Sequence, residues 1–148
     1  MKTSIREYQE QDLAAVMAVW EGASALAHPF LPEEFVAKVR KDIPSLYLPN
    51  AETWVAENDT GVIGFIALLG NEVGAIFVSP ENHGNGTGRL LMDKAHEQKG
   101  DLEVEVFSEN TIGCAFYQRY GFSKIEEKLH DETGCQLVRF QKAAPALE

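Results

Sequence analysis

Three glycines between an apolar segment and a helix-like segment are the residues most directly suited to chemistry in this sequence. The run His83-Gly84-Asn85-Gly86-Thr87-Gly88 follows the apolar stretch 72–79, and helical composition begins at Arg89. Glycines let consecutive backbone amides turn toward one concavity, and a helix N-terminus adds unpaired N–H groups and the positive end of its dipole. Such a unit binds an anion such as a phosphate, although a flexible turn has the same composition.

Spacing excludes two other phosphate-binding loops. A P-loop requires Gly-Lys followed by Ser or Thr, whereas Arg89-Leu90 follows Gly88 here. The dinucleotide fingerprint requires a third glycine three positions after the second. That position holds Arg89 or Leu91, depending on which pair of glycines begins the count.

The loop and the end of the apolar stretch resemble the acetyl-CoA signature of the Gcn5-related N-acetyltransferases, the GNAT family. The family has Arg/Gln-x-x-Gly-x-Gly/Ala after a strand that ends Val-x-Pro, and this sequence has Val78-Ser79-Pro80 and then His83-x-x-Gly86-x-Gly88. His83 replaces the usual Arg or Gln, and its imidazole can also donate a hydrogen bond. In the family, the loop holds the pyrophosphate and the strand pairs with pantetheine. The implied coenzyme-binding residues are Ile76, Phe77, Val78, His83, Gly84, Asn85, Gly86, Thr87, Gly88 and Arg89.

A second motif lies at 110–122. Its pattern, Asn110-x-x-Gly113-x-x-Phe116-Tyr117-x-x-x-Gly121-Phe122, resembles the family's Asn-x-x-Ala-x-x-Phe-Tyr-x-x-x-Gly-Phe, with glycine in place of alanine. Both motifs occur in the family's order and separation. The resemblance covers nearly the whole chain, is closest to small bacterial members of the family, and adds Asn110 and Tyr117 to the coenzyme-binding residues.

The resemblance also implies a reaction, the direct attack of an amine on acetyl-CoA in a ternary complex. Tyr117 matches the family's general acid, which protonates the leaving thiolate. Glu72 stands where some members place a glutamate base, and an exposed strand-end carboxylate is the other interpretation. A backbone amide of the 72–79 strand is expected to stabilise the thioester oxygen. His28 and Phe30 lie in the loop expected to border the acceptor site, although a histidine beside a proline is more often structural.

The sequence therefore predicts an N-acetyltransferase that moves the acetyl group of acetyl-CoA to a primary amine. A protein lysine, a protein N-terminus and a small-molecule amine stay open as acceptors. A non-catalytic acyl-CoA-binding sensor is the alternative, because both motifs serve the coenzyme more than the acceptor.

The elements that must position these residues are predicted from hydrophobic periodicity and turn residues. A helix begins after Asp12 as its N-cap, a loop spans 22–32, and a second helix begins at Pro32 and is bounded by Pro44. Short polar turns predict an antiparallel meander for the strands 53–57, 62–69 and 72–79. The predicted element order is β-α-α-β-β-β-α-β-α-β-β. This order indicates a mixed α/β fold class, more closely of the α+β type. The resemblance implies the GNAT acyl-CoA N-acyltransferase fold, with a mostly antiparallel mixed sheet flanked by helices. The other predicted elements are a strand at 4–8, a helix from Arg89 to Gly100, a strand at 102–106, a helix from Asn110 to Gly121, and a hairpin of 122–129 and 135–141.

Composition limits the partners and the organisation. The 148 residues carry a formal net charge of -10, which argues against a nucleic-acid or anionic-membrane binder. We expect a cytoplasmic monomer or homodimer, because no apolar run is long enough to cross a bilayer and the N-terminal residues lack the apolar region of a secretory signal. Cys114 and Cys135 have no metal-type spacing, so no metal is expected. Residues 1–142 are predicted to form one domain, followed by an unpatterned tail, 143–148, whose last two residues resemble a cloning remnant.

Overall fold

Seven strands form one mixed sheet in the order β1-β2-β3-β4-β5-β7-β6, in a computed structural model that describes residues 2–144. Every neighbouring pair is antiparallel except β4 and β5, which are parallel. This confirms the predicted fold class, the meander of β2, β3 and β4, and the closing hairpin of β6 and β7. The strands are β1 (Ser4–Glu7), β2 (Glu52–Asn58), β3 (Gly61–Leu69), β4 (Glu72–Val78), β5 (Leu102–Phe107), β6 (Ser123–Leu129) and β7 (Gln136–Lys142).

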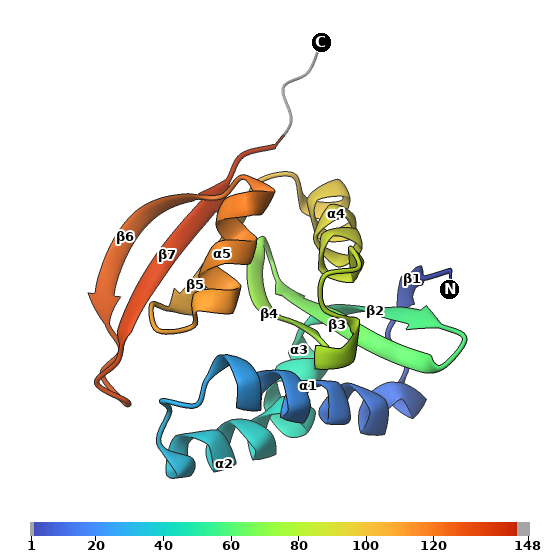
Figure 1. Ribbon diagram of the computed structural model, residues 1–148, viewed down its shortest axis with the longest axis horizontal. Coiled ribbons are helices and arrows are strands. Elements are labelled where there is room, and N and C mark those ends of the chain that lie inside the picture. Colours follow the sequence, from blue (N-terminus) through green and yellow to red (C-terminus); the bar gives the residue numbers. More distant parts are fainter. Residues whose placement is uncertain (1, 145–148) are drawn as a thin grey trace.

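Helices cover both faces of the sheet (Figure 1). The first two long helices lie on one face and the last two on the other, so that the central strands are enclosed. Residues 63–68 of β3 are accordingly all buried, as its nearly continuous apolar run predicts. The long helices are α1 (Leu13–Ala27), α2 (Glu33–Asp42), α4 (Thr87–Lys99) and α5 (Thr111–Tyr120); the short segments are η1 (Glu10–Asp12), η2 (Ile43–Tyr47), α3 (Leu48–Asn50) and η3 (Pro80–Asn82).

Helix α1 is longer than predicted. Residues 22–27 are helical, although they form the first part of the segment predicted as a loop. Ala23 and Ser24 are buried and continue the stripe of Trp20 at helical spacing. A glycine inside a helix costs only about 1 kcal/mol relative to alanine. Burial of the continued stripe offsets that cost, so Gly22 does not end the helix.

Helix α2 ends at Asp42, two residues before Pro44, but the chain does not leave helical geometry there as expected. The chain continues from α2 into the π-helical segment η2 and then into α3. Proline lacks a backbone N–H, and its ring crowds the carbonyl of the residue four positions earlier. The wider π-turn accommodates that ring, so the chain remains helical past Pro44.

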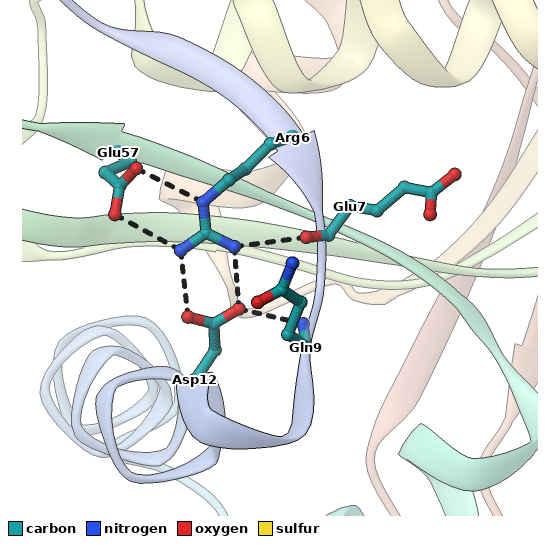
Figure 2. Close-up of polar contacts among 5 residues, drawn as sticks. All are labelled: Arg6, Glu7, Gln9, Asp12 and Glu57. Atoms are coloured by element: carbon teal, nitrogen blue, oxygen red, sulfur yellow. Dashed lines mark hydrogen bonds and ion pairs between the residues drawn. The ribbon is translucent and has the colours of Figure 1, made fainter.

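Asp12 occupies the N-cap position predicted for α1, but its side chain does not cap that helix. It has helical backbone angles and ends η1. Its carboxylate accepts two hydrogen bonds of 2.9 Å from the guanidinium of Arg6 and one of 2.8 Å from the backbone N–H of Gln9. Glu57 of β2 accepts two more from the same guanidinium (Figure 2). The cluster therefore ties β1, β2 and the start of α1 together.

The cap of α5 is where the sequence predicts it. The side-chain oxygen of Asn110 accepts the N–H of Gly113 at 2.9 Å. Near the C-terminal end of the chain, after β7, the backbone N–H of Ala144 donates to the carboxylate of Asp101 at 2.6 Å. Residues 145–148 of the predicted tail lie outside the described residues.

Candidate active site

The parallel pair β4–β5 is short, and a cavity opens where it ends. The two strands pair at only two positions, Glu72↔Glu103 and Val73↔Val104. Beyond them lies a cavity of about 780 Å³, lined by residues of both strands and of α1, α2, α4 and α5. All the predicted site residues except Asn85 and Phe30 line it. Two motifs that are distant in sequence thus face one space.

The glycine loop has the backbone geometry of an anion site. Gly84 and Gly86 have φ angles of +81° and +88°, a region that other L-residues rarely adopt. Gly86 is the N-cap of α4, so the first N–H groups of that helix point toward the loop. The side chain of Asn85 accepts the N–H and the O–H of Thr87 at 3.2 and 2.6 Å. Asn85 therefore shapes the loop instead of lining the cavity.

Two residues of the loop have contacts that their position in the motif does not reveal. Nε2 of His83 lies 2.7 Å from the carbonyl oxygen of Val78, so this ring nitrogen carries the proton and donates it to β4. Gly88 is helical, and a Cβ at this position would lie 3.0 Å from Cε1 of Phe116. Its hydrogen thus permits the close approach of α4 to α5.

Gly74 interrupts the ladder of β4. Pairing with β3 passes from Leu68↔Val73 to Ala67↔Ala75, which leaves Gly74 as the extra residue of a bulge. Bulges free backbone groups from the ladder and occur next to active sites. Gly74 lines the cavity and was not among the predicted site residues. The available signal was a glycine inside an otherwise apolar strand.

Tyr117 reaches the cavity from α5 with most of its ring in the core. Only 7% of the residue is exposed, and its ring packs against those of Phe116, Phe122 and Phe140. Burial raises the pKa of the phenol above its ordinary value, so the hydroxyl is protonated at neutral pH. A protonated hydroxyl at the cavity wall is able to donate.

His28 is a neutral imidazole whose hydrogen bonds determine its tautomer. Asn110 already accepts at its oxygen, so its NH₂ group points at Nε2 of His28, 3.3 Å away. Nε2 is therefore the acceptor, and Nδ1–H donates to the hydroxyl of Ser24 at 3.0 Å. Burial lowers the pKa of His28 to about 4. The imidazole thus connects the end of α1 to the cap of α5.

Aromatic rings surround His28. Its ring meets those of Phe30, Phe77 and Phe107 edge-on, at centroid distances of 5.8–6.1 Å. Phe30 itself does not line the cavity and instead supports His28 and Phe107. His130, from the turn between β6 and β7, packs on Phe107 at 5.3 Å. Phe107 and His130 both line the cavity and were not predicted, because neither belongs to a local motif.

Glu72 reaches the cavity as a member of an ion pair. Its two carboxylate oxygens accept hydrogen bonds from Arg139 of β7, at 2.5 and 3.1 Å. The same guanidinium contacts Glu103 and Glu105 of β5. Both oxygens of the predicted base are thus occupied by a guanidinium, and an acceptor amine would have to compete with Arg139 for them.

A family model described as an acetyltransferase (GNAT) domain matches residues 49–124, which contain both motifs. The chain belongs to the GNAT family. Two relatives, both proteins from Escherichia coli K12, are similar to this chain over most of its length. Peptidyl-lysine N-acetyltransferase YiaC is 32% identical over 87% of this chain and 89% of YiaC. Peptidyl-lysine N-acetyltransferase YjaB is 30% identical over 90% of this chain and 91% of YjaB.

Solved structures agree with this membership. The solution structure of apo YjaB from Escherichia coli matches with a TM-score of 0.85 and 28% identity, over 95% of this chain and 97% of that one. PaiA N-acetyltransferase from Thermoplasma acidophilum, solved in complex with coenzyme A, has the same fold, with a TM-score of 0.77 at 18% identity over 94% of this chain and 98% of PaiA. This GNAT chain is therefore an acetyltransferase, as predicted. None of the helices within residues 2–144 is long and apolar enough to cross a bilayer.

Proposed function

We propose that this GNAT domain transfers the acetyl group of acetyl-CoA to a primary amine. The observation that carries the proposal is the glycine loop at the N-terminus of α4, which opens on the cavity between β4 and β5. The loop amides and Arg89 bind the coenzyme phosphates, and residues 76–78 of β4 follow the pantetheine arm. Two named peptidyl-lysine N-acetyltransferases among the relatives favour a protein lysine as the acceptor.

The transfer requires one bond to form, one to break and two protons to move. The neutral amine attacks the thioester carbon, the C–S bond breaks, and the amine loses a proton as the sulfur gains one. Tyr117 donates its proton to the sulfur, the amine's proton passes to water, and the phenolate takes a proton back from solvent; a freed amide beside Gly74 stabilises the oxyanion. His28 borders the acceptor and acts through its ring because both its nitrogens are engaged, and Phe30 supports that ring from outside the cavity.

A ligand and acceptor panel tests the proposal. Acetyl-CoA and coenzyme A should raise the melting temperature, because a ligand bound only by the folded state stabilises it. Release of free thiol should then be fastest with a lysine peptide blocked at its N-terminus, compared with a peptide N-terminus, a polyamine and an aminoglycoside. A thermal shift with NAD or ATP but none with acetyl-CoA contradicts the donor. Binding without turnover of any amine indicates a sensor.

A further inference from the structure

The pairing of β4 with β5 brings two like charges together. Glu72 lies opposite Glu103 in the register, at one of the only two positions where these strands pair. Like charges directly opposite one another destabilise a strand pair. Repulsion here opposes the short pairing beyond which the two strands separate.

Arg139 supplies the missing cation from a third strand. It lies opposite Glu105 in the β5–β7 register and extends across β5. Its Nε lies 2.8 Å from Glu103, and its two terminal nitrogens bind both oxygens of Glu72. The side chains of Arg139 and Glu72 are only 22% and 32% exposed, which limits screening by water. A planar guanidinium suits such bidentate pairing.

We propose that Arg139 is a positioning residue for the coenzyme site, one that holds β4 against β5 and so sets the width of the cavity between them. The proposal rests on the proposed function. Arg139 does not line the cavity, whereas Glu72 and Glu105 do. Arg139 acts through Glu72 of β4 and through Glu103 and Glu105 of β5, and it touches neither substrate. Glu72 then serves as one end of this bridge instead of as the proton acceptor.

Arg139→Met tests the bridge, with Arg6→Met as the matched control. Arg6 also binds two carboxylates from other segments, and it lies outside the cavity lining. Calorimetry should show coenzyme A binding about 10-fold more weakly to R139M, within the range of residues that act without ligand contact. R6M should lose thermal stability and keep its affinity within about twofold. Wild-type affinity in R139M, or an equal loss in both variants, overturns the proposal.

A rescue separates the bridge from general destabilisation. Glu103→Gln removes the repulsion with Glu72, so adding it to R139M should restore most of the affinity. Glu72→Gln should weaken coenzyme binding when Arg139 is present, because it weakens the bridge, and should partly restore the affinity of R139M, because it removes the same repulsion. If Glu72 is instead the base, E72Q lowers kcat and leaves the dissociation constant unchanged, and the proposal fails.

A measurement without ligand tests the bridge between β4 and β5 separately from the proposed function. Amide hydrogen exchange at Glu103, whose N–H donates to the carbonyl of Asn71 across the two strands, should become faster in R139M. Exchange at Val55 of β2, which lies opposite Arg6 in the β1–β2 register, should become faster in R6M instead. Unchanged exchange at Glu103 in R139M refutes the bridge. A wild-type protein that binds no coenzyme A refutes the proposed function alone.

Discussion

At the scale of single residues, the protonation state of His28 follows from its surroundings. Its two nitrogens are engaged by Ser24 and by the amide of Asn110, and aromatic rings surround the rest of the imidazole. Gly113 is part of this arrangement, since a Cβ there would lie 2.6 Å from Nδ2 of Asn110. The glycine that departs from the family's alanine thus leaves room for the contact with His28.

His28 should make the protein sensitive to acid. The unfolded imidazole takes up a proton near pH 6.5, whereas the folded one does so only near pH 4, so protons favour unfolding between these values. The free energy of unfolding should fall by up to roughly 3 kcal/mol across this window. His28→Gln should lack this part of the fall in urea titrations between pH 7 and 4. His83→Gln, at an exposed position, is the control, and the same fall in both variants contradicts the prediction.

Removing the hydroxyl of Tyr117 should slow catalysis. Tyr117→Phe keeps the ring in its packing and should lower kcat at least about 10-fold, with little change in acetyl-CoA affinity. Steady-state kinetics on one preparation give both constants. Tyr120→Phe is the matched control on the same helix, because that hydroxyl already donates to Asp93 at 2.6 Å. A raised KM with unchanged kcat indicates coenzyme anchoring, and unchanged kinetics rule out the acid role.

At the scale of elements, the strand–loop–helix unit of β4 and α4 combines two kinds of glycine. Gly86 has a positive φ with open space around the position of a Cβ, so its backbone shape is what glycine provides. Gly88 is helical and lies against Phe116, so its small size is what matters. The first glycine determines the path of the loop amides, and the second determines how closely α4 approaches α5.

Alanine at these two glycines should therefore have different effects. Gly86→Ala strains the left-handed backbone by about 1–2 kcal/mol and should weaken coenzyme A binding about 10-fold as the loop shifts. Gly88→Ala should mainly lower the melting temperature, and Phe116→Leu should recover part of that loss by making room. Calorimetry and thermal unfolding separate the two effects. If G86A and G88A bind coenzyme A with equal affinity, the backbone shape of the loop at Gly86 has no particular role in binding.

At the scale of the whole molecule, ion clusters join segments that are far apart in the chain. Arg6 connects the edge strand β1 to β2 and to the start of α1 (Figure 2). Arg139 connects β7 to β5 and β4 at the other side of the sheet. The sheet is thus held by a guanidinium on each side of the central strands.

The Arg6 cluster should stabilise the protein in a pH-dependent way. The hydrogen bond from Arg6 lowers the pKa of Asp12, so the carboxylate stabilises the fold above its unfolded pKa of 3.8 and this contribution is lost as the pH falls below that value. Asp12→Asn should reduce the free energy of unfolding by about 2 kcal/mol at pH 7 and by less at pH 3. Urea titrations measure both. Lys38→Gln, which breaks the exposed pair with Glu132, should change little, and an equal loss there contradicts the assignment.

The sequence by itself determined the features that depend on neighbouring residues. The glycine spacing of 84–88, the cap at Asn110 and the meander of β2, β3 and β4 each depend on backbone preferences within a few positions, so their patterns could be read directly. The same holds for the family resemblance, because both motifs are short and contiguous. The end of α1 was mispredicted, because burial of Ala23 and Ser24 outweighed the local preference of Gly22. The π-helical continuation past Pro44 was not predicted, because a proline ring normally ends a helix.

Only the tertiary structure decided what the chemical groups face. The ion pair of Glu72 depends on Arg139, 67 residues away, and the contact of His28 with Asn110 spans 82 residues. The neutrality of His28 and the raised pKa of Tyr117 come from burial by several elements at once. The separation of β4 from β5, where the cavity opens, is likewise a property of the assembled sheet. Electrostatics and burial depend on distances in space, which residue spacing along the chain does not specify.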